Sequence, residues 1–254
     1  FIQHGMNFYS EAYTLTINAL AEAGFRVIAV DRIGYGKSSK PILPYSFNMV
    51  AANMKALLDE LGVEKTAIVG HSMGGMAVSR FAMMYPETTT HVVMVNQIGL
   101  TDQRQSRPWS DPFVGGGATT YQSILRGHQR YFPLKWPPAH LEFVRRQYGQ
   151  TLGGDWPRLA QVRRLQGQML YDDPVVYDWQ HIATKALVIG GEEDGLVDDF
   201  PTLAHNVANQ LQNSAIILYP NVGHAPQIEI PDLFHQDLIR FLSSDADEPA
   251  SNWK

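Results

Sequence analysis

Short apolar runs alternate with amphipathic segments along most of this chain, and this alternation restricts its possible folds more than any other feature. The segment from Phe47 to Leu61 is typical, because its apolar side chains recur at three- and four-residue spacing, which predicts a helix that Gly62 ends. Strands that alternate with helices favour an α/β fold with a mostly parallel sheet flanked by helices. By the same reasoning we expect strands at 1–3, 26–30, 66–69, 91–95, 185–189 and 215–218, and further helices at 11–23, 73–84 and 233–242.

One region interrupts the alternation, because residues 101–182 contain no clear strand-forming run. A connection of about 80 residues is too long for a plain loop, so we expect a helical insertion, or cap, between two sheet strands. The core would then comprise residues 1–100 and 183–243, followed by a flexible tail at 244–254.

The composition is that of a globular protein, with 44% hydrophobic residues and a formal net charge of −5. A protein that binds the phosphate backbone of nucleic acids would carry a basic stripe, so we expect no nucleic-acid partner. The doublets Arg145-Arg146 and Arg163-Arg164 are the densest basic spots, and we expect both on solvated helix faces.

The chain contains no cysteine, which excludes disulfides, a cysteine-ligated zinc site and a thiol nucleophile. It has no run of about 18 apolar residues either, so we expect no membrane span. Because the chain begins abruptly at Phe1, inside an expected strand, we expect its true N-terminus to be missing. These features leave open the oligomeric state and the compartment, cytoplasmic or exported.

The most specific motif is Gly70-His71-Ser72-Met73-Gly74, which lies between an expected strand and an expected helix. A strand that turns sharply into a helix forces its central residue into a strained backbone conformation, and the glycines on either side leave room for it. The hydroxyl of Ser72 would then be exposed above the sheet edge, where the N–H groups that open the helix face any negative charge that forms.

A serine hydroxyl is a weak nucleophile near neutral pH, so it needs a histidine as base and a carboxylate behind that base. The strand at 185–189 leads into a loop with Asp194, and the strand at 215–218 leads into a loop with His224. Both loops follow the carboxyl ends of parallel strands, where ligands bind in open α/β sheets. Their order after Ser72 is the nucleophile–acid–base order of such folds.

Other acids compete with Asp194 for the supporting role, namely Glu192, Glu193, Asp198 and Asp199. Asp194 fits best the spacing from the preceding strand. The acid could instead follow the strand at 91–95, but that strand ends in Asn96, which cannot carry the charge.

With these residues in place, the chain resembles serine hydrolases of the α/β-hydrolase fold that carry a helical cap. The matching motifs, in the family's order, are His4-Gly5, the segment from Asp31 to Ser38, the turn at Ser72, residues 191–194 and the segment from Gly223 to Pro226. They span nearly the whole chain outside the insertion. The resemblance implies Ser72 as nucleophile, His224 as base and Asp194 as the acid that orients it, with no metal ion or organic cofactor.

The resemblance also implies an oxyanion hole of two backbone N–H groups. One would come from Met6, with Asn7 as the adjacent alternative, and the other from Met73. Relatives often carry a proline where this chain has Met6-Asn7-Phe8, and a side-chain donor from Asn7 toward the oxyanion is a further hypothesis.

A serine at this turn implies acyl chemistry, whereas haloalkane dehalogenases and epoxide hydrolases of this fold form their covalent ester on an aspartate. The family therefore implies a small-molecule substrate, and we expect cleavage of an ester-type bond in a small apolar molecule, as by a carboxylesterase. The alternatives are a lactonase, a carbon–carbon bond hydrolase, a perhydrolase, an aminopeptidase or, from another class, a ligand receptor with slow turnover.

For contacts with the substrate we expect Trp109 and Trp136 of the insertion. His71, beside the nucleophile, is expected either to contact the substrate as part of the pocket lining or to pack under the turn. His4 is expected to hydrogen-bond the backbone of the oxyanion loop. The histidines without a motif are expected on the surface: His128, His140, His181, His205 and His235.

Overall fold

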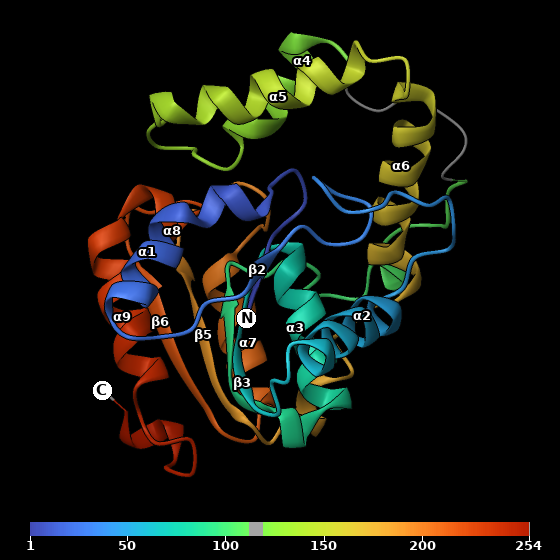
Figure 1. Ribbon diagram of the computed structural model, residues 1–254. Coiled ribbons are helices and arrows are strands. Elements are labelled where there is room, and N and C mark those ends of the chain that lie inside the picture. The colour runs from blue at the N-terminus through green and yellow to red at the C-terminus, as the bar shows by residue number, and fades with distance from the viewer. Residues whose placement is uncertain (112–118, 254) are drawn as a thin grey trace.

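The computed structural model describes residues 1–111 and 119–253 (Figure 1). In this part of the chain six parallel strands form one sheet, in the order β2-β1-β3-β4-β5-β6. The strands are β1 (Ile2–Gln3), β2 (Ala29–Val30), β3 (Thr66–His71), β4 (Thr89–Val95), β5 (Lys185–Gly191) and β6 (Ser214–Tyr219). The predicted α/β architecture is confirmed, although β2 is shorter than the strand expected at 26–30.

Helices follow the strands as the sequence predicts. The α-helices of the described residues are α1 (Thr14–Glu22), α2 (Phe47–Glu60), α3 (Met73–Met84), α4 (Tyr121–Gln129), α5 (Leu141–Thr151), α6 (Trp156–Asp172), α7 (Phe200–Gln210), α8 (Pro226–Glu229) and α9 (Pro231–Leu242). Short 3-10 helices lie at Ser10–Tyr13, Pro86–Thr88, Gln103–Gln105, Pro138–His140, Trp179–His181 and Ala250–Asn252.

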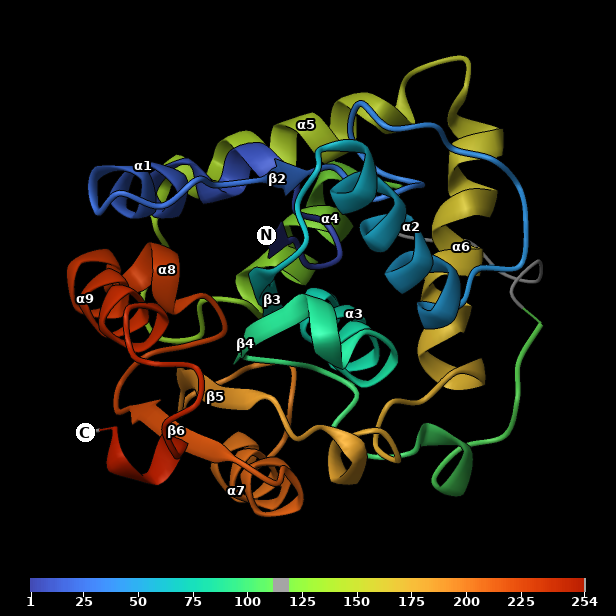
Figure 2. The same cartoon turned by 60° about the horizontal axis from the view of Figure 1, so that its bottom comes forward.

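The sheet is buried on both faces, because successive side chains of a strand point to opposite sides. Val92 and Val188 belong to a core shared with α2, α3 and α7. Val93 follows Val92 on β4, and Leu187 precedes Val188 on β5. Both belong to a second core shared with α1 and α9. The sheet therefore lies between two helical layers (Figures 1 and 2) and presents its carboxyl edge to the insertion.

The insertion is helical, as predicted, and its described residues contain no strand. Helices α4 and α5 lie above the sheet at the top of Figure 1, and α6 descends beside α2. Residues 112–118 of the insertion lie outside the described part of the chain.

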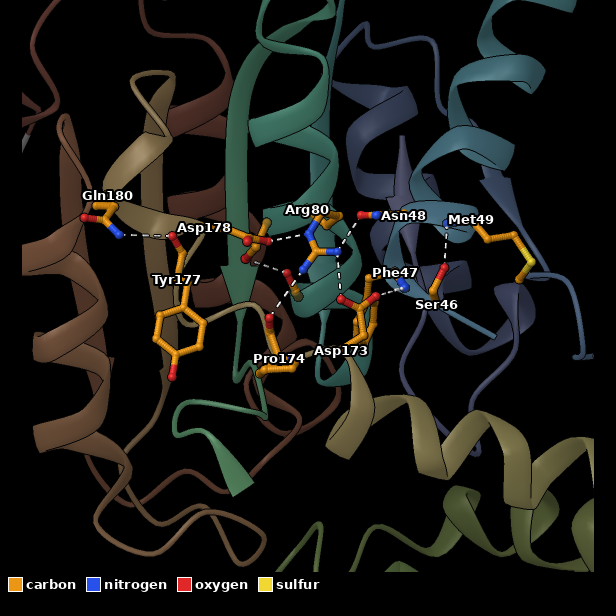
Figure 3. Close-up of polar contacts among 12 residues, drawn as sticks. Ser46, Phe47, Asn48, Met49, Arg80, Asp173, Pro174, Tyr177, Asp178 and Gln180 are labelled. Atoms are coloured by element: carbon orange, nitrogen blue, oxygen red, sulfur yellow. Dashed lines mark hydrogen bonds and ion pairs between the residues drawn. The ribbon is translucent and has the colours of Figure 1, made fainter. Parts of the chain in front are cut away.

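Arg80 of α3 ties the end of the insertion to the core (Figure 3). Its Nε donates to Asp178 Oδ2 at 2.6 Å, and its Nη1 donates to Asp173 Oδ1 at 2.9 Å. The other oxygen of Asp173 accepts from the N–H of Phe47, which begins α2, at 2.6 Å. The arginine side chain is only 7% exposed, so this network joins α2, α3 and the segment after α6 in a place shielded from water.

The C-terminal segment, which we predicted to be a flexible tail, packs against the sheet instead. Ala250 is fully buried, and its N–H donates to Asn213 Oδ1 at 2.6 Å. Lys185 Nζ donates to the carbonyl of Asp245 at 2.6 Å. The expectation failed because the polar composition of the segment does not reveal these partners. In the described residues, no helix combines the length and the apolar character that crossing a membrane requires.

Three histidines predicted on the surface are buried, whereas His181 and His205 are exposed as expected. His128 Nδ1 lies 2.9 Å from His140 Nε2, and His235 Nε2 lies 2.9 Å from the hydroxyl of Thr16. The prediction was wrong for these three because each ring has a polar partner that lets it enter the interior.

Candidate active site

Ser72 lies at the turn between β3 and α3, in a backbone conformation that few residues other than glycine adopt. Its φ is 58° and its ψ is −123°, and such conformations cost about 1–3 kcal/mol. Two hydrogen bonds hold it there, because its N–H donates to Val95 O at 2.9 Å and its carbonyl accepts from Gly75 N–H at 2.9 Å. The residue is therefore fixed at the carboxyl end of β3.

Glycines surround Ser72 because larger residues would collide with packed atoms. A Cβ at Gly75 would lie 2.6 Å from the Cβ of Gln97, and one at Gly70 would lie 2.7 Å from Val78 Cγ2. A Cβ at Gly5 would lie 2.8 Å from the Cβ of Ser72 itself. The loop that contains His4-Gly5 is thus in direct contact with the turn.

The structure joins His224 to Asp194, although they come from different loops. Nδ1 of His224 lies 2.6 Å from Oδ2 of Asp194, and both side chains are fully buried. The same oxygen accepts from Nδ2 of Asn96 at 2.9 Å, and Oδ1 accepts from the N–H of Leu196 at 2.8 Å. These hydrogen bonds fix the carboxylate and favour its charged form.

The protonation of this pair follows from opposing effects on the pKa of Asp194. Burial raises that pKa, but the neighbouring His224 ring and the hydrogen bonds lower it further, so the net shift is downward. An ionised Asp194 accepts a hydrogen bond from the N–H at Nδ1 of His224, and in the tautomer with that proton the lone pair of the ring lies on Nε2. Among the described residues, this buried Nε2 has no hydrogen-bond partner, so it is free to accept a proton.

His71 holds the backbone of His224 through a hydrogen bond. Its Nε2 donates to the carbonyl of His224 at 2.8 Å, so its Nδ1 accepts from the hydroxyl of Tyr13 at 2.7 Å. Burial and then the nearby His224 ring lower the pKa of His71 to about 3. Of the two places expected for His71, these hydrogen bonds favour the one under the turn, because both ring nitrogens are engaged by the protein. A contact with the substrate stays a prediction.

The loop after β1 is shaped by His4. The N–H of Arg32 donates to His4 Nε2 at 2.9 Å, so the neutral ring carries its proton on Nδ1, which donates to the carbonyl of Gly5 at 2.8 Å. Burial and then the charge of Arg32 lower the pKa of His4 to about 3, which keeps the ring neutral. His4 bonds the backbone of this loop, as expected.

Met6, Asn7 and Met73 border the turn, and their oxyanion role stays a prediction. Met6 follows Gly5 directly, and Met73 is the first residue of α3. The side chain of Asn7 points elsewhere than we hypothesised, because Nδ2 donates to the hydroxyl of Tyr131 at 2.8 Å and Oδ1 accepts from Arg163.

The two tryptophans predicted to contact substrate differ in their exposure. Trp109 is 56% exposed. Trp136 packs edge-on against Phe132 and His140, with ring centroids 5.8 and 5.4 Å apart. The contact of either ring with substrate stays a prediction.

Three further residues support the pair but escaped the sequence analysis. The ring of Tyr131 stacks on that of His224 with centroids 5.5 Å apart, and its carbonyl accepts from the His224 N–H at 2.9 Å. Glu229 accepts from the N–H groups of the two residues that flank His224, at 3.0 and 3.1 Å. Asn96 was noticed at a strand end, but only as an unsuitable acid. Nothing in the sequence signals the roles of Tyr131 or Glu229.

Known proteins resemble this chain over nearly its whole length. Residues 1–231 match the family model described as the alpha/beta hydrolase fold. A probable hydrolytic enzyme from Pseudomonas aeruginosa PAO1 is 34% identical, and its crystal structure matches with a TM-score of 0.92, covering 96% of this chain and 84% of that one.

Two curated relatives carry the names of hydrolases. Bifunctional epoxide hydrolase 2 from Sus scrofa is 40% identical over 92% of this chain but only 49% of its own length. A 2-hydroxy-6-oxo-6-phenylhexa-2,4-dienoate hydrolase from Burkholderia cepacia is 27% identical over 91% of this chain and 82% of the relative.

Proposed function

The chain belongs to the alpha/beta hydrolase fold family, and on that premise we propose that it is a serine hydrolase that cleaves an ester-type bond through an acyl-enzyme. Its triad is Ser72, His224 and Asp194. The observation that carries this proposal is the buried 2.6 Å hydrogen bond between His224 and Asp194, which leaves Nε2 of the histidine free.

In the first half of the reaction, Nε2 of His224 takes the hydroxyl proton of Ser72 as its oxygen attacks the carbonyl carbon. The imidazolium that forms is stabilised by ionised Asp194. Backbone N–H groups of Met6 and Met73 hold the oxyanion, and each such donor lowers the barrier by about 3 kcal/mol. His224 then returns the proton to the leaving alcohol.

In the second half, water replaces the alcohol. His224 takes a proton from the water as the water attacks the acyl-serine, and it then gives the proton back to the oxygen of Ser72. The free acid leaves and the starting state is restored. The substrate that suits this scheme best is a carboxylic ester with a small apolar portion.

The epoxide hydrolase relative raises a different chemistry, which the residue at the turn argues against. Opening an epoxide in this fold uses a carboxylate as nucleophile, whereas this chain has the hydroxyl of Ser72 at that place. A serine forms an acyl-enzyme from a carbonyl compound, so we favour acyl chemistry.

The test is hydrolysis of short-chain 4-nitrophenyl esters together with fluorophosphonate labelling. We expect steady turnover and a single adduct on Ser72, and the Ser72→Ala variant should lose at least about 10³-fold in kcat. Ser106→Ala is the matched control, because Ser106 is exposed and distant in sequence. If the Ser72→Ala variant retains the hydrolysis rate, the proposal is refuted. If the unchanged protein turns over once, slowly, and retains the product tightly, a ligand receptor is favoured instead.

A further inference from the structure

A cavity of about 240 Å³ lies between the loop after β1 and the insertion. Side chains from the loop, α5 and α6 line it, and they include Met6, Asn7, Gln147, Trp156, Arg163 and Arg164. The arginine doublet Arg163-Arg164, which we expected on a solvated helix face, is partly exposed and lines this cavity.

The cavity carries two positive charges and no carboxylate. None of its lining residues is Asp or Glu, and within the described part of the chain no ion pair involves either arginine. Arg163 donates to Asn7 Oδ1, a neutral oxygen. Nε of Arg164 is buried without a hydrogen-bond partner among residues 1–111 and 119–253.

This lack of a carboxylate is informative because both arginines, which are partly exposed at the cavity, can pair with an anion from outside the chain. A guanidinium also presents its N–H donors in a planar fork that matches the two oxygens of a carboxylate. The missing partner thus has the chemistry of a carboxylate.

The cavity adjoins the turn at Ser72. Met6 and Asn7 line it, and they directly follow Gly5, which lies against the Cβ of Ser72. Met6, Trp156 and Ala160 give the cavity an apolar part of its lining. A molecule whose carbonyl lies at Ser72 could therefore pass an apolar segment along the cavity and end at the charges.

We infer that this cavity is a subsite for a carboxylate group of the substrate, held by Arg163 and Arg164. The inference rests on the proposed function, which it narrows from simple apolar esters to esters with an apolar linker and a terminal carboxylate. Arg164 supplies the unpartnered donor, whereas Arg163 also holds Asn7 in place.

The test compares esters that differ only in the charged group. One pair is 4-nitrophenyl hydrogen glutarate and 4-nitrophenyl 5-methylhexanoate, which place a carboxylate or an isopropyl group at the end of the acyl part. The other pair is 4-butanoyloxybenzoate and 4-isopropylphenyl butanoate, which place them on the alcohol part. The readout is the ratio of kcat/KM for the charged ester to that for the neutral ester.

In Arg164→Met we expect this ratio to fall about tenfold to hundredfold for at least one pair, because a charge-assisted hydrogen bond is lost. The pair that responds identifies the part of the substrate that occupies the cavity. Arg145→Met is the matched control, since Arg145 is exposed on the neighbouring helix α5 and does not line the cavity. Its ratio should equal that of the unchanged protein.

A ratio that is unchanged for both pairs in Arg164→Met overturns the inference, even if Ser72→Ala confirms the serine hydrolase. If no ester is cleaved, the proposed function fails, and calorimetric titration with glutarate decides about the cavity separately. Binding that is weakened at least tenfold by Arg164→Met supports the subsite. Equal binding, or binding of inorganic phosphate in place of glutarate, overturns it.

Discussion

Two arginine sites in this protein differ in one respect, which is whether the chain supplies their anionic partners. Arg80, at the base of the insertion, has two carboxylates within 2.9 Å and donates to a backbone carbonyl as well. Arg163 and Arg164, on the inner side of the insertion, have none in the described residues. Removing one member of a buried network of paired charges destabilises a fold strongly, whereas an arginine without an internal anion can pair with one from a ligand.

The largest effect should come from removing the internally paired charge. Arg80→Met leaves the buried Asp178 and the partly buried Asp173 without their partner, and we expect the free energy of unfolding to fall by about 3–5 kcal/mol. Arg164→Met removes no internal partner and should change it by less than about 1 kcal/mol. Urea denaturation measures both values. Equal losses would show that the two sites do not differ as we describe.

A control for surface electrostatics is available in the same chain. Arg158 pairs with Asp155 on an exposed face, where water screens the charges. Arg158→Met should destabilise the protein far less than Arg80→Met.

The next effect concerns three buried, neutral histidine rings, those of His4, His71 and His140. Burial is the main cause that lowers the pKa values of His4, His71 and His140 to about 3, below the ordinary value of 6.5. The unfolded chain therefore binds protons that the folded chain does not as the pH falls from 6.5 toward 3. Stability is fully present above pH 6.5 and is lost across this window, by up to about 1.4 kcal/mol per pH unit for each ring.

Denaturation at a series of pH values measures this slope. His140→Phe should reduce it by the contribution of one ring, whereas His205→Gln, at an exposed position, should leave it unchanged. A slope that does not depend on His140 would contradict the burial argument.

The smallest effect tests the link between the insertion and the catalytic pair. Tyr131 stacks on His224 and accepts from Asn7, which in turn accepts from Arg163. Tyr131→Leu removes the stacked ring, so we expect kcat to fall about tenfold with little change in KM. Tyr131→Phe keeps the ring and should restore most of the rate. If both variants lose the same activity, the hydroxyl rather than the ring is what positions His224.

The helices and strands of the core could be predicted from the sequence because the patterns that indicate them extend over a few neighbouring residues. The bounds of α3 were predicted to the residue, since Gly70 to Gly74 mark its start and apolar spacing marks its face. β3 to β6 were predicted to within two residues at each end, because continuous apolar runs are typical of strands buried on both faces. Where partners are distant in sequence, as for His128, His235 or the segment at 244–253, the sequence reading failed.

The residues of the candidate site also fall into those that the sequence predicts and those that only the structure reveals. Ser72, Asp194 and His224 each follow a strand, so the sequence alone places them at one edge of a parallel sheet, and a local pattern suffices to find them. Only the tertiary structure decided that Asn96, Glu229 and Tyr131 support the pair. It also decided that both ring nitrogens of His71 bond the protein and that Arg163 and Arg164 line a cavity. The physical reason is that backbone periodicity is encoded over a few neighbouring residues, whereas burial and charge pairing depend on contacts between segments that only folding brings together.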